Sequence, residues 1–226
     1  MSVPEGVNAM VTENRSREDV LERIRAANRG VARGGSAASE WAAIPRGYRC
    51  AAGSDGEAVI ALLEDRLRDY DALTWRSTRM EVAEAIGGRL AERGDPRMIV
   101  PMGFPQEMLP STGRFTVDDG FTAAELDGFE GVLTTATMAI AETGTLVLQN
   151  VAGQGRRAAT LVPDYHLCVV DMRDVVLSVP AAIERLAPTS TLPTTFVSGP
   201  SATADIEMTR IKGVHGPRFL EVILFS

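Results

Sequence analysis

Cysteine, histidine and lysine are scarce in this chain of 226 residues, and their scarcity limits the chemistry that it can hold. The chain has two cysteines, Cys50 and Cys168, and two histidines, His166 and His215. An ordinary iron–sulfur cluster is held by four cysteine thiolates, so this chain alone cannot ligate one. The two cysteines form no Cys-x-x-Cys pair, which argues against a zinc site and favours reduced thiols. We therefore expect no metal site and no bound cofactor within this chain.

The sequence features of several other protein classes are also missing. Aromatic residues make up 5% of the chain and no basic stripe occurs, so nucleic-acid binding is not expected. No run approaches the roughly 18 apolar residues that suggest a membrane span. Residues 1–14 lack the basic and apolar parts of a secretory signal, so we expect a cytoplasmic protein. The motifs of dinucleotide, P-loop nucleotide, zinc-peptidase and serine-hydrolase sites are absent too.

Charge is unevenly distributed along the chain, whose formal net charge is −7. Residues 51–150 carry 8 arginines and 17 acidic residues, whereas residues 151–226 carry 7 basic and 7 acidic residues. The last third is therefore positive relative to the middle of the chain. This contrast favours a small anionic ligand bound by the C-terminal third.

Composition divides the chain into residues 1–53, an N-terminal helix with a linker or arm, and residues 54–226, the main domain. The helix is expected to begin at a capping box at Ser16 and to end near Gly30. Alternating strand and helix patterns in the main domain predict an α/β fold, a three-layer sandwich with a largely parallel sheet plus a β-hairpin. We expect helices over 54–67, 83–91, 122–127 and 181–186, strands over 72–75, 98–100, 115–117, 167–170, 195–197 and 219–225, a hairpin from 138–141 and 146–148, and a helical turn over 203–209.

Two neighbouring segments in the middle of the chain carry polar residues in loops. Glu142, Thr143, Gly144 and Thr145 form the expected hairpin turn, where Glu142 can act as a general base beside turn amides. A plain hairpin with a solvated glutamate explains the same residues. Downstream lie three further candidate ligands for an anion, Asn150, Arg156 and Arg157. An exposed basic loop is the alternative for the two arginines.

The C-terminal third holds two more polar segments. Residues 198–205 run from a strand into an expected helix start, whose backbone N–H groups would cradle an anion together with Gly199, Ser201, Thr203 and Asp205. Simple helix capping by one hydroxyl is the alternative. Two residues for catalysis follow in a glycine-rich loop: the chain's only lysine, Lys212, and His215 as a proton-transfer group.

Several of these segments, in this order, resemble the LUD-domain family, most closely its short lactate-utilisation C type. They are Ala-Glu-Thr-Gly-Thr-Leu at 141–146, Arg-Arg at 156–157, Val-Pro with a histidine at 162–166, Ser-Gly-Pro-Ser-Ala-Thr-Ala-Asp-Ile-Glu at 198–207 and Gly-Val-His-Gly-Pro at 213–217. The resemblance implies a fold related to ribose-phosphate isomerases and coenzyme A transferases. It also implies a role in oxidation of L-lactate to pyruvate together with iron–sulfur partner proteins. Because this chain lacks the cysteines for a cluster, we expect the clusters only in those partners.

The leading hypothesis is therefore a subunit of a lactate-oxidising complex that binds a small anion and assists proton transfer. One alternative is an isomerase, transferase or ligase acting on a phosphorylated or coenzyme A substrate, which rests partly on the fold. The other is a scaffold or regulatory subunit without catalytic activity. The sequence leaves these three readings open.

Overall fold

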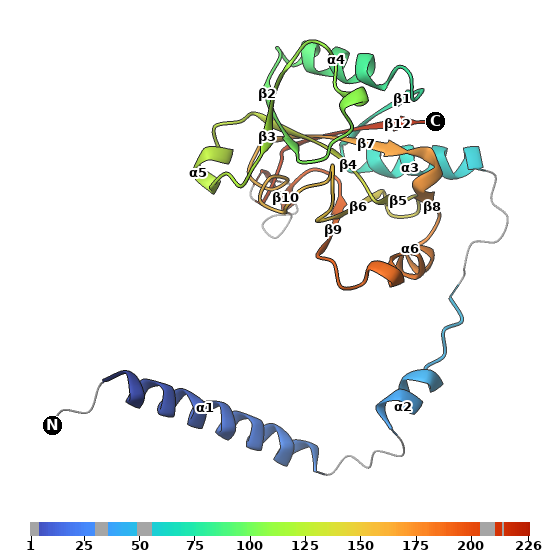
Figure 1. Ribbon diagram of the computed structural model, residues 1–226. Helices are drawn as coiled ribbons and strands as arrows, with labels where there is room; N and C mark the ends of the chain where they lie inside the picture. The colour runs from blue at the N-terminus through green and yellow to red at the C-terminus, as the bar shows by residue number, and fades with distance from the viewer. Residues whose placement is uncertain (1–4, 30–35, 49–55, 204–210, 214) are drawn as a thin grey trace. The chain divides into compact units, whose positions relative to one another are not determined.

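The computed structural model describes residues 5–29, 36–48, 56–203, 211–213 and 215–226, and the chain divides into two units, Met1–Gly47 and Tyr48–Ser226. The first unit contains helices α1 (Glu5–Asn28) and α2 (Ala37–Ala43) (Figure 1). Because α1 begins before Ser16, that serine lies inside the helix and does not cap it. Helix α2 lies in the stretch expected to be a linker. The domain boundary expected at residue 53 falls among residues 49–55, outside the described residues.

The second unit is built on a six-stranded sheet in which every pair of neighbouring strands is parallel. Its strand order is β1-β12-β7-β4-β2-β3. Strands β12 and β7 are adjacent interior strands and are almost wholly buried, as their nearly continuous apolar runs predict for strands covered on both faces. The strands are β1 (Leu73–Ser77), β2 (Arg97–Pro101), β3 (Arg114–Asp118), β4 (Gly131–Thr135), β7 (Tyr165–Asp171) and β12 (Phe219–Phe225).

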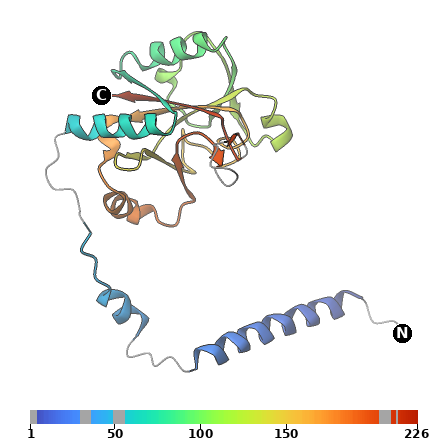
Figure 2. The same cartoon turned by 180° about the vertical axis from the view of Figure 1, so that it is seen from behind.

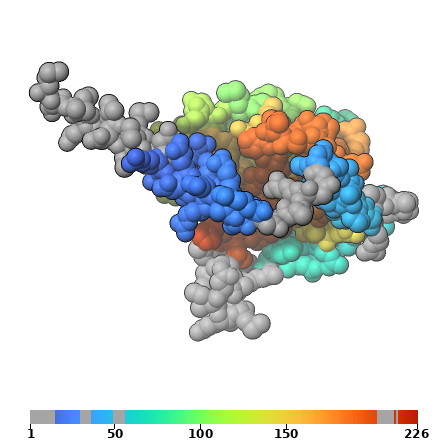
Figure 3. Space-filling model, turned by 90° about the horizontal axis from the view of Figure 1, so that it is seen from below, coloured from blue at the N-terminus to red at the C-terminus, as the bar shows by residue number. Residues whose placement is uncertain are grey.

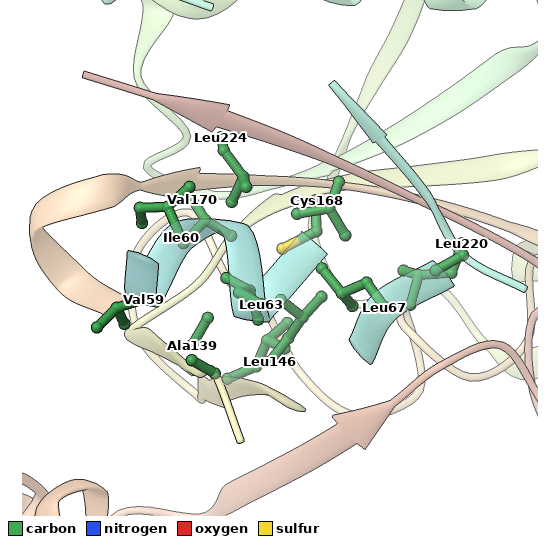
Figure 4. Packing of buried hydrophobic residues seen from close by; sticks show 14 residues of the cluster. Val59, Ile60, Leu63, Leu67, Ala139, Leu146, Cys168, Val170, Leu220 and Leu224 are labelled. Carbon is green, nitrogen blue, oxygen red and sulfur yellow. The ribbon is translucent and has the colours of Figure 1, made fainter. Parts of the chain in front are cut away.

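Helices cover the two faces of this sheet, as the opposite views of Figures 1 and 2 show for α4 (Val82–Glu92) and α3 (Gly56–Asp69). Side chains alternate along each strand, so successive residues reach opposite layers. In β7, Leu167 and Val169 pack in the cluster that includes α4, whereas Cys168 and Val170 pack with α3. Figure 4 shows side chains of α3 meeting those of β5, β6, β7 and β12 in this second core.

A second sheet lies on the α3 side, with strand order β8-β5-β6-β9. Strands β5 (Met138–Ile140) and β6 (Thr145–Gln149) form the expected antiparallel hairpin, and β9 (Thr194–Ser198) pairs antiparallel with β6. Helix α6 (Val179–Leu186) packs on the outer face of this sheet and forms part of the surface in Figure 3. The remaining short elements are α5 (Ala123–Leu126), β8 (Val175–Val176), β10 (Ala202–Thr203), β11 (Ile211–Lys212) and the 3₁₀ turns Gln106–Met108, Met172–Asp174 and Ala187–Thr189.

The α/β class, the parallel sheet and the hairpin agree with the sequence prediction, and three local expectations are corrected. Strand β4 was not expected. Strand β9, which covers the expected strand 195–197, does not join the parallel sheet, because its partner is β6 of the second sheet. Thr203 does not begin a helix, because it lies in β10 and pairs with Ile211. The rest of the expected helical turn, residues 204–209, lies outside the described residues.

Candidate functional site

A cavity of about 250 Å³ lies between the two sheets at the amino ends of β7 and β12. Four parts of the chain meet there: the loop between β6 and β7, the first residues of β7 and β12, the end of β9 and the segment before β12. The lining residues are 157, 160, 166, 196–202, 215–217 and 220. Segments that are far apart in the sequence therefore share one hollow, which we call the anion cavity because of the charges described next.

The lining of the anion cavity is positive. Of the lining residues that the structure describes, Arg157 carries a permanent charge and none is acidic, although the whole chain has a net charge of −7. The Arg157 Nη1 donates to the carbonyl oxygen of Thr160 at 3.3 Å and to its Oγ1 at 3.2 Å, which fixes one edge of the guanidinium. A guanidinium oriented in this way suits a carboxylate or phosphate.

His166 forms part of the cavity wall from within β7 and is 1% exposed. Its Nε2 lies 2.8 Å from Oγ1 of Thr134 on the neighbouring strand β4. Burial, together with the positive charge of Arg157, lowers the pKa of His166 to about 4. The imidazole is therefore neutral near pH 7, so it can hydrogen-bond a ligand but adds no charge.

Ser201 holds the segment that carries His215. Its Oγ accepts a hydrogen bond from the backbone N–H of His215 at 3.0 Å, and its carbonyl oxygen accepts from Gly213 at 3.0 Å. Its own N–H donates to the carbonyl of Pro217 at 2.7 Å. Three hydrogen bonds of one serine thus position His215, which is exposed at the cavity.

Gly199 allows the chain to turn into the cavity after β9. Its φ is +77°, and a Cβ at this position would lie 2.4 Å from the Cβ of Tyr70. Both the backbone conformation and the close approach therefore require glycine. The sequence-predicted pair Gly199 and Ser201 lies in the cavity with Arg157 and His215.

The hairpin turn of Glu142 lies beside the cavity and does not line it. Thr143 Oγ1 lies 2.7 Å from Thr145 Oγ1, which in turn lies 2.8 Å from the Oγ of Ser198, a lining residue. Gly144 packs on the backbone of Arg66 in α3 with φ +58°. Glu142 itself is exposed and is not among the lining residues, so its role as a base stays a prediction that its position does not support.

Arg156 points to a different part of the molecule from Arg157. Its Nε donates to Oδ2 of Asp118 at 2.8 Å and its Nη2 to Oδ1 at 2.9 Å. Nη2 also donates to the carbonyl oxygen of Phe121. Asp118 thus balances the charge of Arg156, and of the two arginines predicted to bind an anion only Arg157 lines the anion cavity. Asn150 lines a second cavity with Arg156 and a small one that Arg157 borders.

The remaining predicted residues are placed only in part. Thr203 and Lys212 lie in the two-stranded ribbon β10–β11, where Lys212 pairs with Ala202, a lining residue. The helix start expected at Thr203 is wrong, because the backbone there forms a strand, whereas the anion cradle of residues 198–205 stays a prediction. Asp205 lies outside the described residues.

Three lining residues with polar side chains were missed as site residues: Thr160, His166 and Ser198. His166 is embedded in a strand, where a histidine is more often structural than functional. The alternation of side chains along the strand could have identified His166 as a site residue. It places His166 on the same face as Cys168 and Val170, which pack toward the second sheet. Ser198 is the first residue of segment 198–207, which resembles the family. Its contact with Thr145, however, depends on the pairing of β9 with β6.

Two features are absent from the described part of the chain: a membrane-spanning helix and a metal-binding cluster. No helix there is long and apolar enough to cross a membrane. Among the same residues, no group of three or more histidine, cysteine, aspartate or glutamate side chains is arranged to hold a metal ion.

Comparison with known proteins places the chain in a family. The family model of the LUD domain matches residues 10–225. Lactate utilization protein C of Deinococcus radiodurans is 38% identical over 219 residues, covering 95% of this chain and 99% of that protein. Lactate utilization protein C of Bacillus subtilis is 28% identical, covering 93% and 96%. The crystal structure of a DUF162 family protein from Deinococcus radiodurans matches with a TM-score of 0.68 and 35% identity, covering 77% of this chain and all of that one. The chain therefore belongs to the LUD-domain family.

Proposed function

We propose that this chain is a subunit of an L-lactate utilisation system and binds L-lactate, or its product pyruvate, in the anion cavity. The observation that carries the proposal is the charge of that cavity: an oriented Arg157 and no described acidic lining residue, in a chain that is acidic overall. The names of the curated relatives supply the pathway. The cavity supplies a place for the carboxylate that both molecules carry.

The groups around Arg157 suit a 2-hydroxy acid. The guanidinium pairs with the carboxylate, and the hydroxyls of Ser198 and Ser201 can hydrogen-bond the oxygen on the neighbouring carbon. His166 is neutral, so it can hydrogen-bond the substrate without repelling or attracting the carboxylate, but its low pKa makes it a weak base. His215, held through its backbone by Ser201, is the proton-handling group at the cavity.

Iron–sulfur clusters belong to partner proteins in this proposal. Oxidation of lactate to pyruvate releases two electrons and two protons, so an electron acceptor must take part. The two cysteines of this chain do not fit a four-thiolate cluster. Moreover, Cys168 is buried without exposure, which raises the pKa of its thiol to about 12 and keeps it protonated. We assign binding and proton transfer to this chain and electron transfer to its partners.

Deletion of the gene followed by growth on L-lactate tests the pathway. Growth should be lost, and the wild-type gene and an Arg68→Ala variant should restore it, since Arg68 is an exposed helix residue away from the cavity. Arg157→Ala should fail to restore it. Undiminished growth of the deletion strain, in a host with no second lactate-oxidising system, would refute the role.

Thermal unfolding with added ligands tests the site. A ligand present at 100 times its Kd stabilises the folded chain by about 2.7 kcal/mol, so L-lactate or pyruvate should raise the Tm of the wild type. Neither should raise the Tm of Arg157→Ala. Stabilisation by sugar phosphates or coenzyme A, with none by lactate or pyruvate, would favour the transferase and isomerase alternative. Unchanged lactate oxidation by Arg157→Ala with its partners would favour a scaffold.

A further inference from the structure

A second cavity, of about 390 Å³, lies at the carboxyl ends of β2 and β3. Its lining comes from Pro101 to Gly103 after β2, from Asp118 and Gly120 after β3, and from the loop between β6 and β7. Its volume falls within the range of about 300–1,000 Å³ that is usual for ligand pockets. It does not share Arg157, His166, Ser201 or His215 with the anion cavity.

The position of this second cavity is one where open parallel sheets bind ligands. After β2 the chain passes to the 3₁₀ turn Gln106–Met108, whose Met108 packs on the α4 side. After the neighbouring strand β3 it passes to α5, whose Leu126 packs with Ile99 on the opposite face of the sheet. Connections that leave neighbouring strands toward opposite faces open a crevice at the carboxyl ends, and ligands bind in such crevices.

Gly153 lies next to the lining residue Ala152 and holds the loop that forms one wall of this crevice. Its N–H donates to the carbonyl of Met102 at 3.0 Å, and its own carbonyl accepts from the N–H of Thr135 at 2.8 Å, so the loop is tied to the ends of β2 and β4. The φ of Gly153 is +77°, and a Cβ there would lie 3.0 Å from Oγ1 of Thr135. The wall is therefore built from fixed backbone.

The charges in the second cavity cancel. The side chain of Asp118 is 4% exposed and holds Nε and Nη2 of Arg156, which leaves Nη1 as a further donor of the same oriented guanidinium. The pair carries no net charge, unlike the anion cavity. The amide of Asn150 is a second polar group, and the other walls are mainly apolar, with Met102 and Val151 among them.

From this arrangement we propose that the second cavity binds an uncharged ring compound with carbonyl groups. The apolar walls cover the ring, and the donors of Arg156 and Asn150 meet its carbonyl oxygens. A free anion is a poor ligand, because Asp118 already balances Arg156 and repels further negative charge. This site is separate from lactate binding and does not depend on it.

Menadione, an uncharged naphthoquinone, is the probe for this proposal, with binding to the purified chain measured by calorimetry. It should bind with a stoichiometry of one per chain, and 2-methylnaphthalene, which has the same ring system without carbonyl groups, should bind at least about tenfold more weakly. Met102→Trp, which fills the cavity from an exposed position, should weaken menadione binding by at least about tenfold. Met80→Trp is the matched control, since Met80 is 95% exposed and does not line this cavity.

Three results would overturn the proposal. They are no saturable binding of menadione up to its solubility limit, equal binding to the wild type and Met102→Trp, and equal binding of the two probes. The lactate-induced rise in Tm should be the same in Met102→Trp and the wild type. If lactate fails to bind while menadione binds as expected, the function proposed for the anion cavity fails and the second site stands.

Discussion

Replacing Arg156 with alanine removes one partner of a buried ion pair and tests how the second cavity is built. The whole Asp118 residue, backbone included, is 9% exposed. Arg156 supplies two of the hydrogen bonds to its carboxylate, at 2.8 and 2.9 Å. The backbone N–H groups of Gly120 and Phe121 supply the other two, at 3.1 and 3.3 Å. Arg156→Ala therefore leaves a buried carboxylate with half of its hydrogen bonds and without its countercharge.

The expected loss of stability is about 2 kcal/mol. Removing one partner of a fully buried pair costs about 3–5 kcal/mol. The Arg156 side chain is 35% exposed and Asp118 keeps two backbone donors, so the lower part of that scale, reduced for solvent screening, applies. Urea unfolding at pH 7 measures the change. Arg66→Ala is the control, since its pair with Asp69 is exposed on both sides and should contribute less than about 0.5 kcal/mol.

The pH dependence of this difference separates the ion pair from simple packing. Burial alone would raise the pKa of Asp118, but hydrogen bonds from Arg156 and the backbone outweigh it, so the pKa lies below its usual value. A carboxyl whose folded pKa is lowered stabilises the fold fully above its unfolded pKa near 3.8, and this stabilisation is lost as pH falls through the folded pKa. The gap between Arg156→Ala and the wild type should shrink below about pH 4. A gap that is the same at pH 7 and pH 3, or one no larger than that of Arg66→Ala, would refute this account.

Three further predictions concern the anion cavity and its neighbouring turn. The folded pKa of His166, about 4, lies below the unfolded value of 6.5, so stability should be full above pH 6.5 and should fall by up to about 3 kcal/mol as pH drops toward 4. Urea unfolding across this range should show a much smaller loss in His166→Gln. Ser201→Ala should speed hydrogen exchange at the amide of His215 by at least about fivefold, since about 1 kcal/mol of hydrogen bonding is lost; an unchanged rate would count against the positioning role. Gly144→Ala should lower the Tm more than Gly94→Ala, because both have positive φ but only Gly144 has a neighbour within 4 Å.

The class of fold could be predicted from the sequence because two interior strands of the main sheet have a clear hydrophobic pattern. β7 and β12 are continuous apolar runs, and helices with a single apolar stripe separate most of the other strands. Strand β4 was missed because Gly131 at its start is typical of a loop and because Ala136 and Thr137, which are not a turn signal, separate it from the hairpin. The structure explains that glycine: a Cβ at Gly131 would lie 2.6 Å from Sδ of Met98. Steric fit across strands cannot be deduced from local pattern.

The grouping of Ser201 with His215 could be predicted, whereas the backbone that joins them could not. Both residues lie in glycine-bearing segments of unusual composition, and such segments form loops at sites. Thr203 was expected to start a helix because serine, threonine and aspartate, which occur at positions 201, 203 and 205, are typical of helix caps. Pairing of β10 with β11 satisfies the same backbone groups instead. Side-chain propensity is a weak guide wherever a strand partner from elsewhere in the chain is available.

The two adjacent arginines show where sequence reasoning about the site reaches its limit. Arg156 and Arg157 look equivalent in sequence, yet their side chains serve different cavities. What separates them is Asp118, which lies 38 residues earlier and meets Arg156 only because β3 and the β6–β7 loop end at the same edge. Arg156, whose charge is balanced by a buried carboxylate, presents oriented hydrogen-bond donors. Arg157 has no such partner, so its charge attracts an anion. The chemistry of each arginine is thus set by its tertiary partner, so the two cavities of one loop can differ in charge although the loop carries the same residue twice.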